Sequence, residues 1–377
     1  MVTQLYAFIL RVYRGVPRTN LTRERRPLGD RGLPVHLRDS HGSRSSLDDR
    51  GPMRRREIIL MLWAASSIRP AWAQQPAVPV IGYLGLESPG VYGSRLRAFR
   101  EGLAETGYGE DRNITIVYRW AEGHYDRLPA LATDLLTHRI SVLAAPGGAP
   151  VALAAKSVST TIPIVFEMGG DPVALGMVDS LSRPGGNLTG VSSLSVEVSR
   201  KRLEFLHKII PGAPAIAIVA NPTSPTAPLQ LSNLHEAAST LGVQLHVLQA
   251  STEAELDVVF SDGPRQRPDG LVFTSDPYFA NRSQRLADLA QRHRIPAITQ
   301  SRDFPLAGGL MSYGGDFTQS HRDAGTYVGR ILRGEKPADL PVRLVTKVEA
   351  FINLQAANDL GITVPPALII SADRVIE

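Results

Sequence analysis

Short apolar runs alternate with amphipathic segments along most of this chain, and the alternation limits the folds that it can adopt. Runs such as Pro79–Leu84 and Ala215–Ala220 are apolar on both faces, which is typical of strands with no solvent-exposed side. In the segments between such runs, apolar residues recur at helical spacing, as Leu96, Phe99 and Leu103 do. Strands that are apolar on both faces and alternate with helices predict parallel sheets covered by helices on both sides.

The alternation occurs in two successive blocks of similar size, separated by the Pro/Gly-rich segment Arg183–Thr189. Further strands are predicted at Asn113–Tyr118, Ile140–Ala144, Ile162–Phe166, Gln244–Leu248, Gly270–Thr274 and Ala297–Thr299. We therefore predict an α/β protein with two similar Rossmann-like lobes, each a mostly parallel sheet flanked by helices.

An export signal precedes this alternation. Met53 is followed by three arginines, then by the apolar run Ile58–Ala65 and the small-residue motif Ala71–Ala73. This order is typical of a cleavable signal peptide, here residues 53–73, and the apolar run is too short to cross a bilayer. The paired arginines suit the twin-arginine route, and the general secretory route remains equally open. Residues 1–52 are either a stretch ahead of a translation start at Met53 or a disordered extension.

The basic charge of the chain is confined to its leader. Residues 1–73 contain 14 Arg, no Lys and 6 acidic residues, whereas the remainder contains 27 basic and 30 acidic residues. Because the body is mildly acidic, we expect no nucleic-acid partner. Two arginine-rich groups are interpreted as solvated helix faces: Arg200–Arg202, and Arg282 with Arg285, Arg292 and Arg294.

Small or polar residues follow the predicted strands, at the end where open α/β sheets bind ligands. These segments are Glu87–Pro89, Pro146–Gly148, Gly169–Pro172, Asn221–Thr223, Ser275–Pro277 and Tyr313–Asp316. Glycines allow backbone N–H groups to approach a bound carboxylate, and a helix N-terminus favours negative charge. Asp171 and Asp276 are either ligand-binding carboxylates or helix N-caps. Convergence of these segments predicts a binding cleft.

Signatures of catalysis are absent from the sequence. It contains no G-x-S-x-G elbow, no Walker loop and no H-E-x-x-H motif, and the absence of cysteine excludes thiol nucleophiles and disulfides. The seven histidines beyond the leader have no metal-binding spacing and are interpreted as surface or hydrogen-bonded residues: His124, His138, His207, His235, His246, His293 and His321. We expect a protein that is not an enzyme and has neither cofactor nor metal.

Several longer motifs occur in a specific order. They are Ala145–Gly148, Gly169–Val173, Ser182–Val191, Gly308–Gly314, Ile331–Val342, and Asn353 with Leu360–Ile362. Together they resemble the substrate-binding proteins of ABC transporters with a type I periplasmic-binding fold. The resemblance covers nearly everything from Met53 to Glu377.

This resemblance implies two lobes that are joined by three crossovers and close over a ligand. The crossovers are expected near Thr189–Val191, Tyr313–Asp316 and Val342–Lys347. Lobe 1 would then comprise residues 76–189 and 315–342, and lobe 2 residues 190–313 and 345–377.

Some members of the family resemble receptors for aromatic or branched-chain amino acids, and this resemblance implies a set of ligand-binding residues. Ser88 and the backbone of Gly147, Gly148 and Ala149 would hold the ligand carboxylate, Asp276 or Asp171 its ammonium group, and Tyr83 or Tyr313 its side chain, with Asn221 also in the site. His321 departs from the family pattern, because relatives often have tyrosine at this position.

We therefore expect a periplasmic, monomeric receptor that captures a small molecule, such as an amino acid, and delivers it to an ABC permease in the inner membrane. Alternatives are a sensory receptor that uses the same fold and an enzyme with its site in the cleft. A transcriptional regulator of this fold would need a helix-turn-helix ahead of lobe 1, and residues 1–52 contain none.

Overall fold

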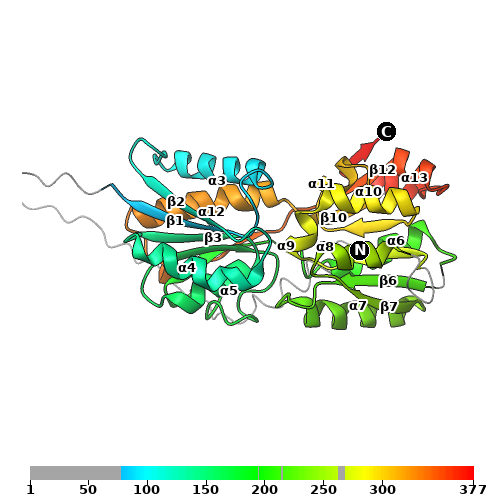
Figure 1. Ribbon diagram of the computed structural model, residues 1–377, viewed down its shortest axis with the longest axis horizontal. Coiled ribbons are helices and arrows are strands. Elements are labelled where there is room, and N and C mark those ends of the chain that lie inside the picture. The colour runs from blue at the N-terminus through cyan, green and yellow to red at the C-terminus, as the bar shows by residue number, and fades with distance from the viewer. Residues whose placement is uncertain (1–77, 194, 214, 262–267) are drawn as a thin grey trace, which may run out of the picture. The chain divides into compact units, whose positions relative to one another are not determined.

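Two sheets, one in each lobe, organise the residues that the computed structural model describes, 78–193, 195–213, 215–261 and 268–377 (Figure 1). All of these residues belong to one compact unit, Gln74–Glu377. The predicted signal peptide and residues 1–52 lie outside the described residues. Within the described ranges, no helix is both long enough and apolar enough to span a membrane.

Lobe 1 contains a fully parallel sheet with strand order β11-β5-β4-β3-β1-β2. Its strands are β1 (Val80–Gly85), β2 (Thr115–Trp120), β3 (Val142–Pro146), β4 (Ile164–Met168), β5 (Leu188–Ser193) and β11 (Arg343–Val345). Helices α4 (Leu128–Thr137) and α5 (Ala149–Val158) cover one face, and α3 (Gly93–Glu105) and α12 (Phe317–Leu332) lie side by side on the other (Figure 1). Most strands are buried on both faces, as the continuous apolar runs predict.

Lobe 2 repeats this architecture with strand order β13-β12-β10-β9-β8-β6-β7, in which only β12 runs antiparallel to its neighbour β10. Its strands are β6 (Ala215–Ala220), β7 (Gln244–Gln249), β8 (Gly270–Phe273), β9 (Ala297–Thr299), β10 (Met311–Gly315), β12 (Val348–Asn353) and β13 (Arg374–Ile376). One core contains α6 (Ser199–Ile209), α7 (Ala227–Leu241), α13 (Leu354–Asp359) and α14 (Pro366–Ser371). The other contains α8 (Glu253–Phe260), α9 (Pro277–Ala280), α10 (Ser283–His293) and α11 (Asp303–Leu306). The predicted two-lobed α/β fold is confirmed.

Glycines hold α12 against α3. A Cβ atom added to Gly325 would lie 2.0 Å from the carbonyl oxygen of Phe99, and one on Gly102 would lie 1.9 Å from that of Arg322. Only glycine permits such an approach between two helix backbones. The contact fixes α12, which follows β10 of lobe 2, onto lobe 1 and so positions its first turns near the carboxyl ends of the lobe 1 strands.

The chain passes between the sheets three times, after β5, after β10 and after β11. The first crossing lies later than the sequence suggests, because β5 remains paired with β4 through Ser192 instead of leaving the sheet near Thr189–Val191. The reason is that β5, although short of bulky apolar residues, is buried along its whole length and is paired on both edges. The third crossing, between β11 and β12, falls within the expected range Val342–Lys347.

A buried arginine, Arg202 on α6, links the first crossing to the end of β10, from which the second crossing starts. Its side chain is fully buried, and it donates hydrogen bonds to the carbonyl oxygens of Ser195 (3.2 Å) and Tyr313 (3.0 Å) and to the Ser275 hydroxyl (2.6 Å). Burial lowers the pKa of the guanidinium to about 9. The interpretation of Arg202 as part of a solvated face is wrong, because it lies one helical turn before Phe205 and Leu206 on the buried stripe of α6.

Replacing this guanidinium is expected to destabilise the protein. Arg202→Met removes the donor that Arg202 supplies to the Tyr313 carbonyl, and leaves the Ser195 carbonyl with the Ser275 hydroxyl as its remaining side-chain donor among the described residues. A buried group left unpaired costs roughly 1–3 kcal/mol. We expect a melting temperature lowered by several degrees in differential scanning calorimetry. The matched control is Arg200→Met on the same helix, because Arg200 is exposed and its surface ion pair with Glu236 contributes little. Equal effects of the two substitutions would contradict this role of Arg202.

Candidate functional site

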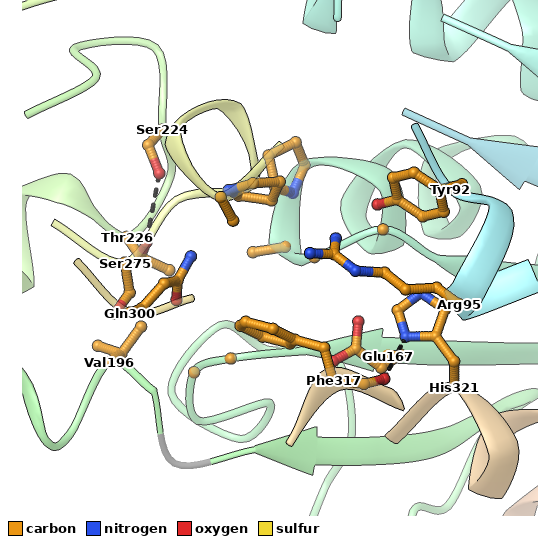
Figure 2. Close-up of a pocket in the computed structure, with 18 residues that line it drawn as sticks. Tyr92, Arg95, Glu167, Val196, Ser224, Thr226, Ser275, Gln300, Phe317 and His321 are labelled. Atoms are coloured by element: carbon orange, nitrogen blue, oxygen red, sulfur yellow. Dashed lines mark hydrogen bonds between the residues drawn. The ribbon is translucent and has the colours of Figure 1, made fainter. Parts of the chain in front are cut away.

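A pocket lies between the lobes, where the carboxyl ends of strands from both sheets meet (Figure 2). It encloses about 510 Å³ of space free of protein atoms, its open mouth included. Lobe 1 and α12 supply Tyr92, Arg95, Gly147, Gly148, Ala149, Pro150, Glu167, Gly169, Gly170, Phe317 and His321. The facing wall consists of Val196, Ser224, Thr226, Ser275, Pro277, Ala280 and Gln300. This mixture of rings, small residues and a few buried polar groups is typical of a site for a small molecule.

The N-terminus of α5 opens into this pocket. Gly148 precedes the helix with φ of 84°, a conformation that favours glycine, and a Cβ there would lie 2.5 Å from the ring of Pro277 in lobe 2. The first-turn N–H groups of Ala149 and Val151 have no intrahelical acceptor, and among the described residues no side chain caps the helix. These groups and the helix dipole favour an anionic ligand atom.

Arg95 brings a buried cation into the pocket from α3. It is 8% exposed, and its Nη1 donates a hydrogen bond to Oδ1 of Asn281 in lobe 2 at 2.8 Å. Its Nη2 lies 3.6 Å from Oδ2 of Asp303, also in lobe 2. The guanidinium carbon lies 5.2 Å from the ring centroid of Tyr92 and 5.1 Å from that of Phe317, within cation–π range. Arg95 therefore links the lobes and keeps part of its positive charge directed at the pocket.

Glu167 is the acidic residue of the lining. It lies on β4 and is 3% exposed, and its Oε1 has no hydrogen-bond partner among the described residues. Burial raises the pKa of the carboxyl to about 7, and the positive charge of Arg95 opposes this rise. Figure 2 shows the carboxyl group pointing into the space between Arg95 and Phe317. A carboxyl that lines the pocket with an unpaired oxygen is a candidate for ligand binding, because buried polar groups in native proteins are usually hydrogen-bonded.

His321, on the second turn of α12, forms the inner wall beside Tyr92. Its Nδ1 lies 2.8 Å from the carbonyl oxygen of Phe317 and its Nε2 lies 3.1 Å from that of Pro146. Burial, with a further contribution from Arg95, lowers the pKa of the imidazole to about 3, so the ring is neutral. A neutral ring carries one N–H group and so donates to only one of the two carbonyls.

Two further polar contacts join the lobes at the edge of the pocket. The Tyr125 hydroxyl of lobe 1 donates to Oδ1 of Asp276 at 2.7 Å. The Arg282 guanidinium lies 3.1 Å from the Glu87 carboxylate, and also pairs with Glu253. The interpretation of Arg282 as a solvated residue is therefore wrong, because 17% of its side chain is exposed and it packs over the Tyr278 ring.

Comparison with known proteins agrees with this architecture. Residues 83–376 match the family described as ABC transporter substrate binding protein, which is most of the chain. The chain belongs to this family. The resemblance seen in the sequence motifs is confirmed by the match.

This substrate-binding protein is similar to a tyrosine-binding protein of Clostridioides difficile, with 26% identity over 68% of this chain and 73% of that one. Among solved structures, a conserved domain protein from Vibrio cholerae has 26% identity and a TM-score of 0.71, covering 79% of this chain and 99% of that one. An ABC domain in complex with L-Trp from Streptococcus pneumonia has 22% identity and a TM-score of 0.69, covering 80% and 100% of the two chains. The similarity to this ABC domain shows a shared fold.

Three of the residues predicted for the site, Gly147, Gly148 and Ala149, line the pocket. Tyr83 is instead fully buried in the lobe 1 core, in ring contact with Phe99, Tyr118 and Trp120. Tyr313 packs on Phe205 in lobe 2, with ring centroids 4.9 Å apart. Ser88 lies in the loop after β1, where its carbonyl oxygen accepts a hydrogen bond from the Tyr92 N–H.

The two candidate aspartates both cap turns. Oδ1 of Asp171, an exposed residue, accepts hydrogen bonds from the N–H groups of Val173 and Ala174. Asp276 is fully buried behind the pocket wall, and its Oδ1 accepts from the N–H of Tyr278 (2.9 Å), the amide of Asn221 (3.1 Å) and the Tyr125 hydroxyl. Asn221 thus supports Asp276 and has no place in the lining.

Arg95, Glu167, Phe317 and His321 were not predicted as site residues. Glu167 could have been found, since it is the one charged residue directly after the apolar run Ile162–Phe166, where the strand continues by two residues. Arg95 gives a weaker signal, because an arginine beside the apolar stripe of a helix is ordinarily solvated. Its burial follows from the contact between the lobes.

The pKa of Glu167 predicts a pH-dependent effect of substitution on the ligand-free protein. The pKa of Glu167 in the folded protein, about 7, lies above the ordinary value of 4.5. The contribution of Glu167 to the free energy of unfolding therefore has its full value below about pH 4.5, where Glu167 is protonated, and decreases as the pH rises through 7. Glu167→Gln cannot lose a proton. We expect the variant to melt like the wild type near pH 4.5 and several degrees higher at pH 8, by calorimetry at both values. A difference that does not change with pH would contradict the buried-carboxyl assignment.

Proposed function

We propose that this substrate-binding protein works outside the cytoplasm, captures an amino acid in the pocket between its lobes and delivers it to an ABC permease in the inner membrane. The observation that carries the proposal is the presence of two opposite charges in one buried pocket, the Arg95 guanidinium and the Glu167 carboxyl, which do not pair with each other. A zwitterion is the small solute that complements such a pair. The similarity to a tyrosine-binding protein supports the same class of ligand.

The backbone of Gly147, Gly148 and Ala149 would take the carboxylate of this ligand. The uncapped N-terminus of α5 supports this placement, because its free N–H groups and positive dipole end face the pocket. The rings of Tyr92 and Phe317, both in the lining, would contact an apolar or aromatic side chain. Gln300 and Ser275 from lobe 2 add neutral polar contacts.

A ligand screen tests this function. We expect an aromatic L-amino acid, L-tyrosine first, to raise the melting temperature of the chain starting at Gln74 by several degrees, since ligand at 100 times its Kd stabilises a protein by about 2.7 kcal/mol. Sugars and nucleosides at equal concentration serve as controls.

The fluorescence of Trp120 offers a second readout. Of the 3 Trp in the sequence it alone follows residue 73, and its ring centroid lies 5.9 Å from that of Tyr92. If none of the twenty amino acids shifts the melting temperature or the emission of Trp120, the amino-acid function is wrong.

Export to the periplasm has its own test. The signal-like segment 53–73 supports cleavage after Ala73, so we expect protein isolated from the periplasmic fraction to begin near Gln74 by N-terminal sequencing. Replacing Ala71 and Ala73 with bulky residues should leave uncleaved precursor in the membrane fraction. A product that stays in the cytoplasm and retains residues 53–73 would contradict export.

A further inference from the structure

The position of Glu167 in its strand is unusual. Residues of β4 alternate between the two faces of the sheet, and Val165, two residues earlier on the same face, belongs to the core beneath α3 and α12. The alternation therefore places Glu167 where an apolar residue would continue that core. Its backbone stabilises the fold, since its carbonyl oxygen accepts a hydrogen bond from the Gly148 N–H at 3.0 Å. In the part of the chain that the structure describes, Oε1 of the side chain has no hydrogen-bond partner.

Two observations show that the carboxyl is available to a ligand. Oε1 is buried without a hydrogen-bond partner among the described residues, although Glu167 lines the pocket. The cation in the same lining, Arg95, is instead bound to Asn281 and lies close to Asp303, both in lobe 2. Arg95 therefore contributes electrostatic attraction to Glu167 without occupying its oxygen.

The other candidate carboxylate, Asp276, differs in each of these respects. Its Oδ1 already accepts hydrogen bonds from Tyr278, Asn221 and Tyr125, and the residue does not line the pocket. Its Oδ2 is buried and has no partner with hydrogen-bond geometry in the described part of the chain, but it lies behind the wall formed by Ser275 and Pro277. A ligand would have to displace that wall to reach it.

Resting on the amino-acid function proposed above, we propose that Glu167 binds the ammonium group of the ligand and that this contact makes the pocket select α-amino acids over the corresponding hydroxy acids. Glu167 and the N-terminus of α5 lie next to each other, because β4 pairs with β3 in the register Glu167↔Pro146 and α5 follows β3 directly. One α-carbon can thus present its ammonium to Glu167 and its carboxylate to the N–H groups of Ala149 and Val151. A hydroxy acid would leave the Glu167 charge without a cation.

Binding of an ammonium group is then coupled to release of a proton. The titratable groups in the lining around Glu167 are Arg95 and Tyr92 from the α3 segment and His321 from α12. Burial raises the pKa of Tyr92 to about 12 and lowers that of His321 to about 3, so neither changes charge near neutral pH. Glu167 does, because burial raises its pKa to about 7. An ammonium group favours the carboxylate, so a pocket that is partly protonated when empty loses its proton when it fills.

A cycle of two proteins and two ligands tests the proposal by isothermal titration calorimetry on the chain from Gln74. The ligands are L-tyrosine and 4-hydroxyphenyllactate, which replaces the ammonium with a hydroxyl group; if the screen returns another amino acid, that compound and its hydroxy analogue are used. We expect Glu167→Gln to weaken binding of the amino acid roughly 30-fold or more and to change binding of the hydroxy acid by only a few-fold. Titrations at pH 7 in two buffers of different ionisation enthalpy should show proton release for the wild type and none for the variant.

Asp276→Asn is the isosteric comparison, and we expect it to weaken amino-acid binding by only a few-fold. Glu101→Gln, on the exposed face of α3, is the control for loss of a negative charge and should bind as the wild type does. Equal losses of both ligands in Glu167→Gln, or a large loss in Asp276→Asn with Glu167→Gln unchanged, would overturn the role of Glu167 while leaving the amino-acid function intact. Failure of the wild type to bind any amino acid would overturn both.

Discussion

A guanidinium removed from water holds together the part of this molecule on which the pocket depends. Arg202 donates to Ser195 on the first crossover, to Tyr313 on the strand that leads to the second, and to Ser275 at the end of β8. Oxygen atoms of the protein thus replace the solvation that burial removes. Because these three partners lie on different segments, their common donor fixes the carboxyl ends of β8 and β10 beside the crossing chain. Ser275 and Pro277, which form the lobe 2 wall, take their positions from this arrangement.

The pocket itself follows from placing two mostly parallel sheets so that the carboxyl ends of their parallel strands face one another. The loops that leave β3, β4, β6 and β8 contribute backbone turns or short side chains, and the glycine contact between α3 and α12 adds Phe317 and His321. Arg95 and Glu167 give this neutral lining its polarity. Arg95 is bound to Asn281, whereas Oε1 of Glu167 has no hydrogen-bond partner among the described residues, so the free site keeps an electrostatic field that suits a zwitterion.

Much of this fold was predictable from the sequence, because apolar runs of strand length and amphipathic helices are local patterns. The glycine turn before α5 was predictable for the same reason, since Gly147 and Gly148 stand between a strand and a helix. The buried charges were not. Arg95, Arg202 and Glu167 are residue types that are ordinarily exposed, and their burial depends on contacts with segments far away in the sequence. The N-cap geometry of Asp276 was one of two readings that the Asp-Pro pair allowed, and choosing between them required its partners Tyr125 and Asn221.

The backbone and the side chain of Glu167 have separate roles, and this separation affects how such receptors can diversify. Its backbone maintains the sheet and the turn before α5, while its side chain makes no hydrogen bond with the rest of the described protein through Oε1. A mutation at this codon therefore changes the chemistry of the pocket without removing a support of the fold. An aliphatic residue there would extend the apolar core of β4 to the pocket surface and leave Arg95 as its main charge. On the role proposed for Glu167, a single substitution at this position would turn a pocket that suits a zwitterion into one that suits an anion.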